Sequence, residues 1–165
     1  MKLAVVGNPI SHSKSPLIFR YLFDAENLEY SYEKLLLLSV DEIPQLFKNE
    51  YNGINITAPF KQSVIPFLDE LAEDAKRIGS VNTVILKDNR LIGYNTDYLG
   101  VVNSLESFNI DLTGKKCLIL GAGGAARAAI YGLKLRNAKI QVFNRTTEKA
   151  ESLAKEFDIE QLKQS

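Results

Sequence analysis

The stretch LILGAGGAARAAI, residues 118–130, decides the fold class of this chain. In it an apolar run ends in a glycine-rich turn and an alanine-rich helical pattern follows, with Gly121, Gly123 and Ala126 at the spacing G-x-G-x-x-A. The first glycine permits a tight turn, the second lets a pyrophosphate approach the backbone, and the small third residue lets helix and strand pack closely. Unpaired amides at the helix start would then hold phosphate. The apolar run KIQVFN at 139–144 supplies the second strand of a nucleotide-binding βαβ unit.

The residues after this second strand indicate which dinucleotide the turn would bind. An Asp or Glu about 20 residues past the glycines ordinarily holds a ribose hydroxyl, but this chain has Asn144, Arg145 and Thr146 there. A guanidinium, a carboxamide and a hydroxyl suit a 2′-phosphate, which an acid would repel. Lys149, one helical turn further on, offers a second cation. The sequence therefore favours NADP over NAD, with a solvated basic helix start as the alternative.

Strand-like and helix-like segments alternate along the whole chain, which is typical of an α/β protein with mostly parallel sheets. We expect one domain over residues 1–98 and an incomplete Rossmann-like dinucleotide-binding domain over 99–165, with a connecting helix at 97–109. The expected elements are strands at 3–7, 29–38 and 52–57, helices at 15–27, 39–50, 64–79 and 97–109, a hairpin at 81–95, and a strand–helix–strand–helix run from residue 117 onward.

The composition excludes several classes of protein. The chain has 165 residues, 45% of them hydrophobic, and its 20 basic and 20 acidic residues give a formal net charge of zero. That balance gives no global attraction to nucleic acid or anionic membranes, and no apolar run is long enough to span a bilayer. The single cysteine, Cys117, excludes an internal disulfide and two-cysteine metal motifs. We expect a buried Cys117 thiol in a soluble cytoplasmic protein without a metal site.

Polar clusters stand where the expected strands give way to loops. They are GNPISHSKSP at 7–16, NITAPFKQ at 55–62 and GYNTDYLG at 93–100, and SVNT at 80–83 adds an asparagine. In open α/β sheets, ligands collect at the carboxyl ends of the strands. The two serine hydroxyls of the first cluster, close to a helix start, suit a small carboxylate.

Lys61 and Asp97 are the candidates for a catalytic pair. A partly desolvated lysine beside a carboxylate can pass a proton at an alcohol carbon while hydride moves to a nicotinamide. For each residue taken singly, the alternative to a catalytic role is a structural one: Lys61 as a solvated lysine and Asp97 as an aspartate that caps a helix. The single histidine, His12, is the one position for a His–Asp base, and no serine or cysteine nucleophile motif is present.

Six motifs in this order and spacing resemble the shikimate dehydrogenase family, whose members reduce 3-dehydroshikimate with NADPH: GNPISHSKSP, NITAPFKQ, SVNTV, GYNTDYLG, LGAGGAARA and NRT. The resemblance covers essentially the whole chain and implies an N-terminal substrate domain and a Rossmann-like domain. It departs from the family at Ala58, where valine is usual, and at Phe19, where many members have histidine. The roles it implies are the substrate carboxylate site for Ser13 and Ser15, the shikimate pocket for Thr57, Asn82 and Thr96, the catalytic pair for Lys61 and Asp97, the cofactor loop for Gly121, Ala122, Gly123, Gly124 and Ala125, and the 2′-phosphate site for Asn144, Arg145 and Thr146 with Lys149.

Family members run well beyond the position of Ser165, so the resemblance also implies a truncated chain. We expect an exposed sheet edge and an uncovered apolar face in the second domain, leading to lower order there or to self-association through that edge. Weak or absent catalysis is the corresponding expectation. The alternatives are a fragment that binds shikimate or NADP without turnover and a quinate/shikimate dehydrogenase; Arg145 argues against an NAD-dependent form of the latter.

Overall fold

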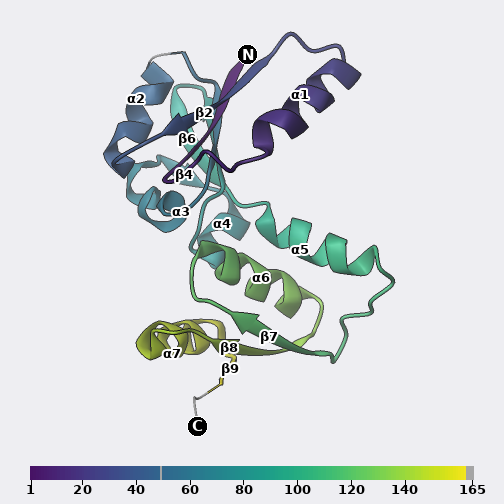
Figure 1. Cartoon of the computed structure of the whole chain (residues 1–165). Helices are drawn as coiled ribbons and strands as arrows, with labels where there is room; N and C mark the ends of the chain where they lie inside the picture. Colours follow the sequence, from purple (N-terminus) through teal and green to yellow (C-terminus); the bar gives the residue numbers. More distant parts are fainter. Residues whose placement is uncertain (49, 163–165) are drawn as a thin grey trace. The chain divides into compact units, whose positions relative to one another are not determined.

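Two compact units make up the structure, a computed structural model that describes residues 1–48 and 50–162 (Figure 1). Unit 1 comprises Met1–Lys76 and Val81–Tyr94, and unit 2 comprises Arg77–Ser80 and Asn95–Ser165. The chain therefore passes from one unit to the other three times. The expected domains at 1–98 and 99–165 stay a prediction.

Unit 1 is built on a six-stranded sheet with the order β2-β1-β3-β5-β6-β4. β1 runs parallel to β2 and β3, β5 is antiparallel to β3 and β6, and β4 is parallel to β6. Buried β-branched residues on the central strands, such as Val6, Ile54 and Val84, form its core. The strands are β1 (Lys2–Gly7), β2 (Ser31–Leu36), β3 (Gly53–Ile56), β4 (Glu70–Leu71), β5 (Thr83–Lys87) and β6 (Arg90–Tyr94), and the helices are α1 (Ser15–Ala25), α2 (Ile43–Lys48), α3 (Phe60–Ser63) and α4 (Glu73–Ile78).

The single helix predicted over 64–79 is wrong. The chain instead forms a 3₁₀ turn at Ile65–Phe67, the short strand β4 and then α4. Leu68 is extended, and the Asp69 amide donates to the carbonyl oxygen of Leu91 at 3.0 Å. Pairing with β6 therefore outweighed the helical pattern, because tertiary contacts override local propensity. The helix predicted over 39–50 is also shorter, a 3₁₀ turn at Val40–Glu42 followed by α2.

The predicted hairpin is confirmed as β5 and β6. Its two turn residues, Asp88 and Asn89, have φ angles of 50° and 58°. Two consecutive positive φ angles match the right-handed twist of the flanking strands, and Asp and Asn tolerate that conformation better than most residues. The hairpin places the start of β5 beside the end of β3, where Asn55 pairs with Thr83.

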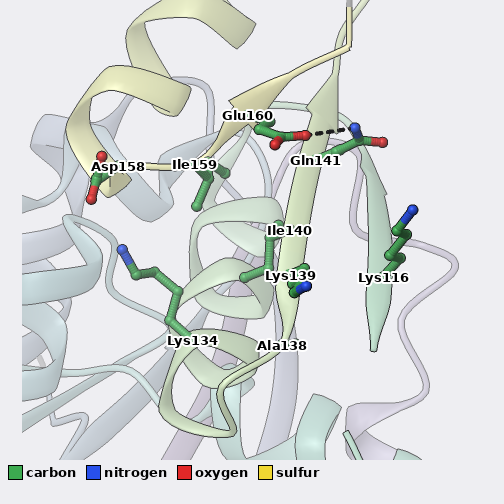
Figure 2. A pocket seen from close by; sticks show the side chains of 9 residues that line it. All are labelled: Lys116, Lys134, Ala138, Lys139, Ile140, Gln141, Asp158, Ile159 and Glu160. Carbon is green, nitrogen blue, oxygen red and sulfur yellow. Dashed lines mark hydrogen bonds between the residues drawn. The ribbon is translucent and has the colours of Figure 1, made fainter. Parts of the chain in front are cut away.

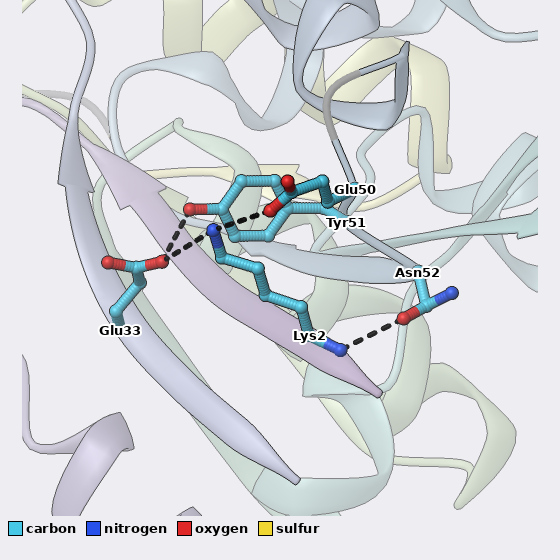
Figure 3. Close-up of polar contacts among 5 residues, drawn as sticks. All are labelled: Lys2, Glu33, Glu50, Tyr51 and Asn52. Atoms are coloured by element: carbon cyan, nitrogen blue, oxygen red, sulfur yellow. Dashed lines mark hydrogen bonds and ion pairs between the residues drawn. The ribbon is translucent and has the colours of Figure 1, made fainter.

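A polar cluster around Lys2 ties β1 to both of its neighbours (Figure 3). The Lys2 ammonium lies 3.3 Å from a Glu50 oxygen and 3.6 Å from a Glu33 oxygen, and it stands 4.6 Å from the centroid of the Tyr51 ring. The Tyr51 hydroxyl donates to Glu33 at 2.5 Å, and the Lys2 amide donates to Asn52 at 2.9 Å. The bond to Glu50 contributes most to a raised pKa of Lys2. Exposed ion pairs add little stability, so the cluster mainly fixes the alignment of these segments.

Unit 2 contains a parallel three-stranded sheet with the order β7-β8-β9. As expected for an incomplete sheet, one face of β7 is poorly covered, with Leu118 49% and Leu120 74% exposed. Cys117 is half-buried against the core of the unit rather than fully buried. Self-association through the edge of the incomplete sheet stays a prediction. The elements are α5 (Asp97–Glu106), β7 (Lys116–Leu120), α6 (Gly124–Leu135), β8 (Lys139–Phe143), α7 (Thr147–Phe157) and β9 (Glu160–Gln161), of which β9 was not predicted.

None of the helices in the described part of the chain has the length and apolar character needed to cross a membrane.

Candidate active site

The loops that follow β1 and β3 pack against each other. A Cβ atom at Gly7 would lie 2.4 Å from the Thr57 methyl group, so only glycine permits this approach. The Thr57 amide donates to the Val6 carbonyl oxygen at 2.9 Å, and the Asn8 amide donates to the Ala58 carbonyl oxygen at 3.0 Å. Thr57 is thereby fixed next to the loop that leads to the predicted serines.

Ser13 and Ser15 form a hydroxyl pair at the start of α1. Their Oγ atoms are 3.2 Å apart, and the Ser15 amide donates to Ser13 Oγ at 3.3 Å. The Ser13 amide in turn donates to the Ile10 carbonyl oxygen at 3.1 Å. Ser15 is the first residue of α1, an end at which the helix dipole favours negative charge. The pair is therefore suited to accept a small carboxylate.

Lys61 and Asn82 are held at the same edge of the sheet. Lys61 lies in α3, and its carbonyl oxygen accepts a hydrogen bond from the Val81 amide at 2.7 Å. Asn82 is 8% exposed, and its carbonyl oxygen accepts from the Ile56 amide at 2.7 Å. β1 and β3 end at this edge and the antiparallel β5 begins there. Five of the predicted substrate and catalytic residues, Ser13, Ser15, Thr57, Lys61 and Asn82, therefore lie on or next to the segments at one edge of the unit 1 sheet.

Thr96 and Asp97 belong to unit 2. Asp97 is the first residue of α5, and its amide donates to Asn95 Oδ1 at 3.0 Å. Asn95 is buried, and its side-chain nitrogen donates to the Ser80 carbonyl oxygen at 2.8 Å. Since Lys61 lies in the other unit, the pairing of Lys61 with Asp97 stays a prediction.

The glycine-rich turn has the geometry expected of a phosphate site. Gly121 has a φ of +123°, which favours glycine, and its amide donates to the Phe143 carbonyl oxygen at 2.7 Å. Gly123 caps α6, and the first hydrogen bond of the helix runs from the Arg127 amide to the Gly123 carbonyl oxygen at 3.1 Å. A Cβ atom at Gly121 or Gly123 would meet nothing within 4 Å. The backbone is thus open to a ligand at the end of a 12-residue helix.

Small residues also let α6 pack closely, as the sequence pattern predicts. Ala126 is 9% exposed. A Cβ atom at Gly132 would lie 2.8 Å from the carbonyl oxygen of Tyr98 in α5. Ala122 packs against the core of unit 2, while Gly124 and Ala125 form the first turn of α6.

The predicted 2′-phosphate residues follow the end of β8. The Asn144 side-chain nitrogen donates to the Thr146 carbonyl oxygen at 2.9 Å, which bends the chain into α7. Arg145, Thr146 and Lys149 are exposed. Because β7 and β8 are parallel, this cluster lies at the same edge as the glycine-rich turn. The residues present therefore fit both phosphate positions of NADP.

A separate pocket of about 610 Å³ opens at the opposite edge of this sheet (Figure 2). Lys116 and Lys139, the first residues of β7 and β8, line it together with Lys134. Figure 2 shows Gln141 donating to Glu160, at 2.8 Å. None of the predicted cofactor residues lines this pocket, so it is distinct from the phosphate-binding edge.

Three residues with structural contacts near these sites were not predicted from the sequence. Arg127 in α6 is 9% exposed and bonds to the carbonyl oxygen of Ile78. The sequence signal that could have identified Arg127 is its position as a single charged residue within an alanine-rich helical pattern. Tyr32 and Asn55 lie on β2 and β3, and their side chains meet at 2.6 Å. Strand periodicity indicates which face a residue occupies but not its partner on a neighbouring strand.

A glycine-rich turn at the start of a helix in unit 2 and a set of hydroxyl, amide and lysine residues at one edge of the unit 1 sheet form a pattern typical of the class of dinucleotide-dependent dehydrogenases. Family comparisons are consistent with each half. The shikimate dehydrogenase substrate binding domain matches residues 5–84, and the shikimate/quinate 5-dehydrogenase family matches residues 104–165. The chain belongs to the shikimate dehydrogenase family.

The individual proteins that this chain resembles include two shikimate dehydrogenases and a 5-ketofructose reductase. The NADP⁺-dependent shikimate dehydrogenase of Carboxydothermus hydrogenoformans is 45% identical over 157 residues, which are 93% of this chain and 56% of the relative. The shikimate 5-dehydrogenase of Thermus thermophilus in complex with NADP(H) and shikimate is 36% identical with a TM-score of 0.90, over 99% of this chain and 63% of that one. The ligand-free 5-ketofructose reductase of a Gluconobacter strain is 30% identical with a TM-score of 0.87, over 100% of this chain and 63% of that one. This chain thus spans a little over half the length of the relatives.

Proposed function

We propose that this chain carries the shikimate-binding groups and the adenosine-phosphate part of the cofactor site of an NADP-dependent shikimate dehydrogenase. The reaction is the reversible reduction of 3-dehydroshikimate to shikimate. The observation that supports it most is the gathering of the serine pair, Thr57, Lys61 and Asn82 at one edge of the unit 1 sheet. Domain limits at residues 98 and 99 are part of the proposal.

The two ends of the substrate would contact different protein groups. The hydroxyls of Ser13 and Ser15 would donate to the carboxylate, aided by the start of α1. Thr57, Asn82 and Thr96 would contact ring hydroxyls. Shikimate carries one carboxylate and several hydroxyls, so a hydroxyl pair together with a set of amide and hydroxyl groups matches it.

Lys61 and Asp97 would handle the proton. NADPH supplies a hydride to the carbonyl carbon when it is bound. Lys61 would then donate a proton from Nζ to the carbonyl oxygen, which completes the alcohol, and Asp97 would stabilise the lysine charge and orient the hydroxyl. In the reverse direction Lys61 would take the hydroxyl proton as the hydride leaves. Atoms and charge balance as ketone plus NADPH plus one proton giving alcohol plus NADP⁺.

On the cofactor side, the turn from Gly121 to Ala125 would hold the pyrophosphate, and Asn144, Arg145, Thr146 and Lys149 would hold the 2′-phosphate. Two alternatives are open. The chain could bind shikimate or NADP⁺ without turnover, or it could accept quinate, since the matching family includes quinate 5-dehydrogenases. The first alternative differs from the main proposal in turnover, and the second differs in the binding of quinate.

The test is a set of titrations of this chain with shikimate, quinate, NADP⁺ and NAD⁺, followed by a turnover assay at saturating shikimate and NADP⁺. Turnover that Lys61→Ala abolishes and Lys76→Ala leaves unchanged would support the full proposal. Lys76 is the matched control because it is an exposed lysine of unit 1. Binding of both ligands without turnover would support the binding-fragment alternative. Failure to bind shikimate at millimolar concentration would refute the proposal.

A further inference from the structure

A chain of side-chain hydrogen bonds connects Tyr32 to the amide end of the proposed substrate site within unit 1. At the other end Ser13 Oγ lies 3.2 Å from Ser15 Oγ, and the Ser15 side chain lies close enough to the Tyr32 phenol to lower its pKa. The Tyr32 hydroxyl donates to Asn55 Oδ1 at 2.6 Å, and Asn55 Nδ2 donates to Thr83 Oγ1 at 3.0 Å. The chain ends where Thr83 Oγ1 donates to Asn82 Oδ1 at 3.0 Å. It crosses β2, β3 and β5 in that order.

The donors and acceptors give the second half of this chain one direction. A phenol has a single hydrogen, and Tyr32 gives it to the Asn55 carboxamide oxygen. That contact turns the Asn55 nitrogen toward Thr83 and toward the Asn82 carbonyl oxygen at 3.4 Å. Thr83 Oγ1 accepts from Asn55 and donates its own hydrogen to Asn82 Oδ1. The Asn82 amide is therefore oriented with its oxygen toward Thr83 and its nitrogen on the other side.

Tyr32 itself is held firmly. Its ring stacks on Phe19 of α1 with a centroid distance of 4.2 Å and an interplanar angle of 9°. Phe19 is followed by Phe23 at 5.8 Å, so the phenol stands against an aromatic face of the helix that starts at Ser15. Burial raises the pKa of Tyr32 to about 12 against the effect of the Ser15 bond. The phenol is thus neutral and rigid over the physiological pH range.

We propose that Tyr32 is a positioning residue: through Asn55 and Thr83 it sets the amide of Asn82 to donate, and its phenol, which lies next to Ser15, also supports the hydroxyl pair at the other end of the substrate site. This inference rests on the proposed function for the identity of the ligand. The orientation of the Asn82 amide does not depend on the proposed function. A tyrosine that only filled space would affect neither end when its hydroxyl is removed.

The decisive variant is Tyr32→Phe, which keeps the ring and its stack on Phe19 and removes only the hydroxyl. Tyr30→Phe is the matched control, because Tyr30 contacts Phe23 edge-on from the same segment. We expect Tyr32→Phe to weaken shikimate binding about tenfold, the equivalent of one hydrogen bond at about 1.4 kcal/mol per factor of ten, and to leave NADP⁺ binding unchanged. In the double variant with Thr83→Val the loss should be less than the product of the two single losses, since both break one pathway.

A second readout needs no ligand. The Asn82 side-chain amide signals in an NMR spectrum of the labelled chain should shift or broaden in Tyr32→Phe and Thr83→Val but not in Tyr30→Phe. Wild-type Asn82 signals together with wild-type shikimate affinity in Tyr32→Phe would overturn the inference. If the wild-type chain does not bind shikimate, the proposed function fails, and the Asn82 signals alone decide whether Tyr32 orients this amide.

Discussion

The guanidinium of Arg127 donates from Nε to the carbonyl oxygen of Ile78 at 2.5 Å, although 49 residues separate the two. The same guanidinium pairs with Glu156 of α7 through Nη1 at 2.9 Å and lies 5.3 Å from the Phe157 ring centroid. Gly79, with a φ of +65°, lets the chain pass so near that a Cβ there would be 2.5 Å from the Arg127 Nη2 atom. One buried cation thereby joins α6, α7 and the end of α4.

Arg127→Met should lower the free energy of unfolding by about 2–4 kcal/mol, because it leaves a buried carbonyl without its charged donor. Glu156→Gln should cost less than about 1 kcal/mol, since the Glu156 side chain is 47% exposed and such pairs are well screened. Urea denaturation of both variants provides the comparison. Equal losses would show that the ion pair, rather than the bond to Ile78, carries the stabilisation.

Ser80→Ala should leave stability unchanged or raise it by up to about 1 kcal/mol. Ser80 is fully buried, and its Oγ has no hydrogen-bond partner among the residues that the structure describes. Removing an unsatisfied hydroxyl relieves a desolvation cost. Ser107→Ala is the control, because that exposed hydroxyl donates to the Ser104 carbonyl oxygen at 2.7 Å. A clear loss of stability in Ser80→Ala, measured by urea denaturation, would mean that the hydroxyl has a partner such as a bound water.

Arg145→Ala should weaken NADP⁺ binding by about 10–100-fold, the range expected for a hydrogen-bonded charge pair. Its effect on NAD⁺ binding should be small, because NAD⁺ lacks the 2′-phosphate. Lys155→Ala, an exposed lysine further along α7, controls for the loss of positive charge. Calorimetric titrations with both nucleotides give the loss of affinity for NADP⁺ relative to the loss for NAD⁺. A parallel loss for NADP⁺ and NAD⁺ would place Arg145 elsewhere on the cofactor or in the fold.

The free energy of unfolding should fall between pH 10 and pH 12 more steeply in the wild-type chain than in Tyr32→Phe. Burial raises the pKa of Tyr32 from 10.0 to about 12 in the folded chain. The unfolded tyrosine ionises first, so the stabilisation is complete below pH 10 and is lost as the pH rises through the folded pKa. Comparing the two chains removes the contribution of Tyr51, whose pKa is also raised. Parallel pH profiles would show that the Tyr32 phenol titrates normally.

Local signals in the sequence were reliable guides to local structure. The last helix of the strand–helix–strand–helix run predicted from residue 117 onward is found as Thr147–Phe157, and Gly79 ends α4 as its positive φ requires. The glycine-rich turn was predictable because the backbone conformation that calls for each glycine is set by only a few neighbouring residues. The same holds for the hairpin turn at Asp88 and Asn89.

Features that depend on distant partners could not be predicted. The segment 64–79 has a helical pattern, yet its pairing with β6 draws part of it into β4. The contact between Tyr32 and Asn55 spans 23 residues and joins β2 and β3 across the intervening β1. Likewise the bond from Arg127 to Ile78 depends on how the chain returns to unit 2. In each case the deciding partner lies far away in the sequence.

The return of Arg77–Ser80 to unit 2 has a consequence for dissecting the protein into pieces. A fragment that starts at Asn95 would lack the carbonyl that Arg127 binds and the one that Asn95 binds at Ser80. A fragment that stops at Tyr94 would carry the same four residues without those partners. Expressing either piece alone would therefore remove both hydrogen bonds. A circularly permuted or internally tagged version should instead be opened at an exposed turn within one unit, such as Asp88–Asn89.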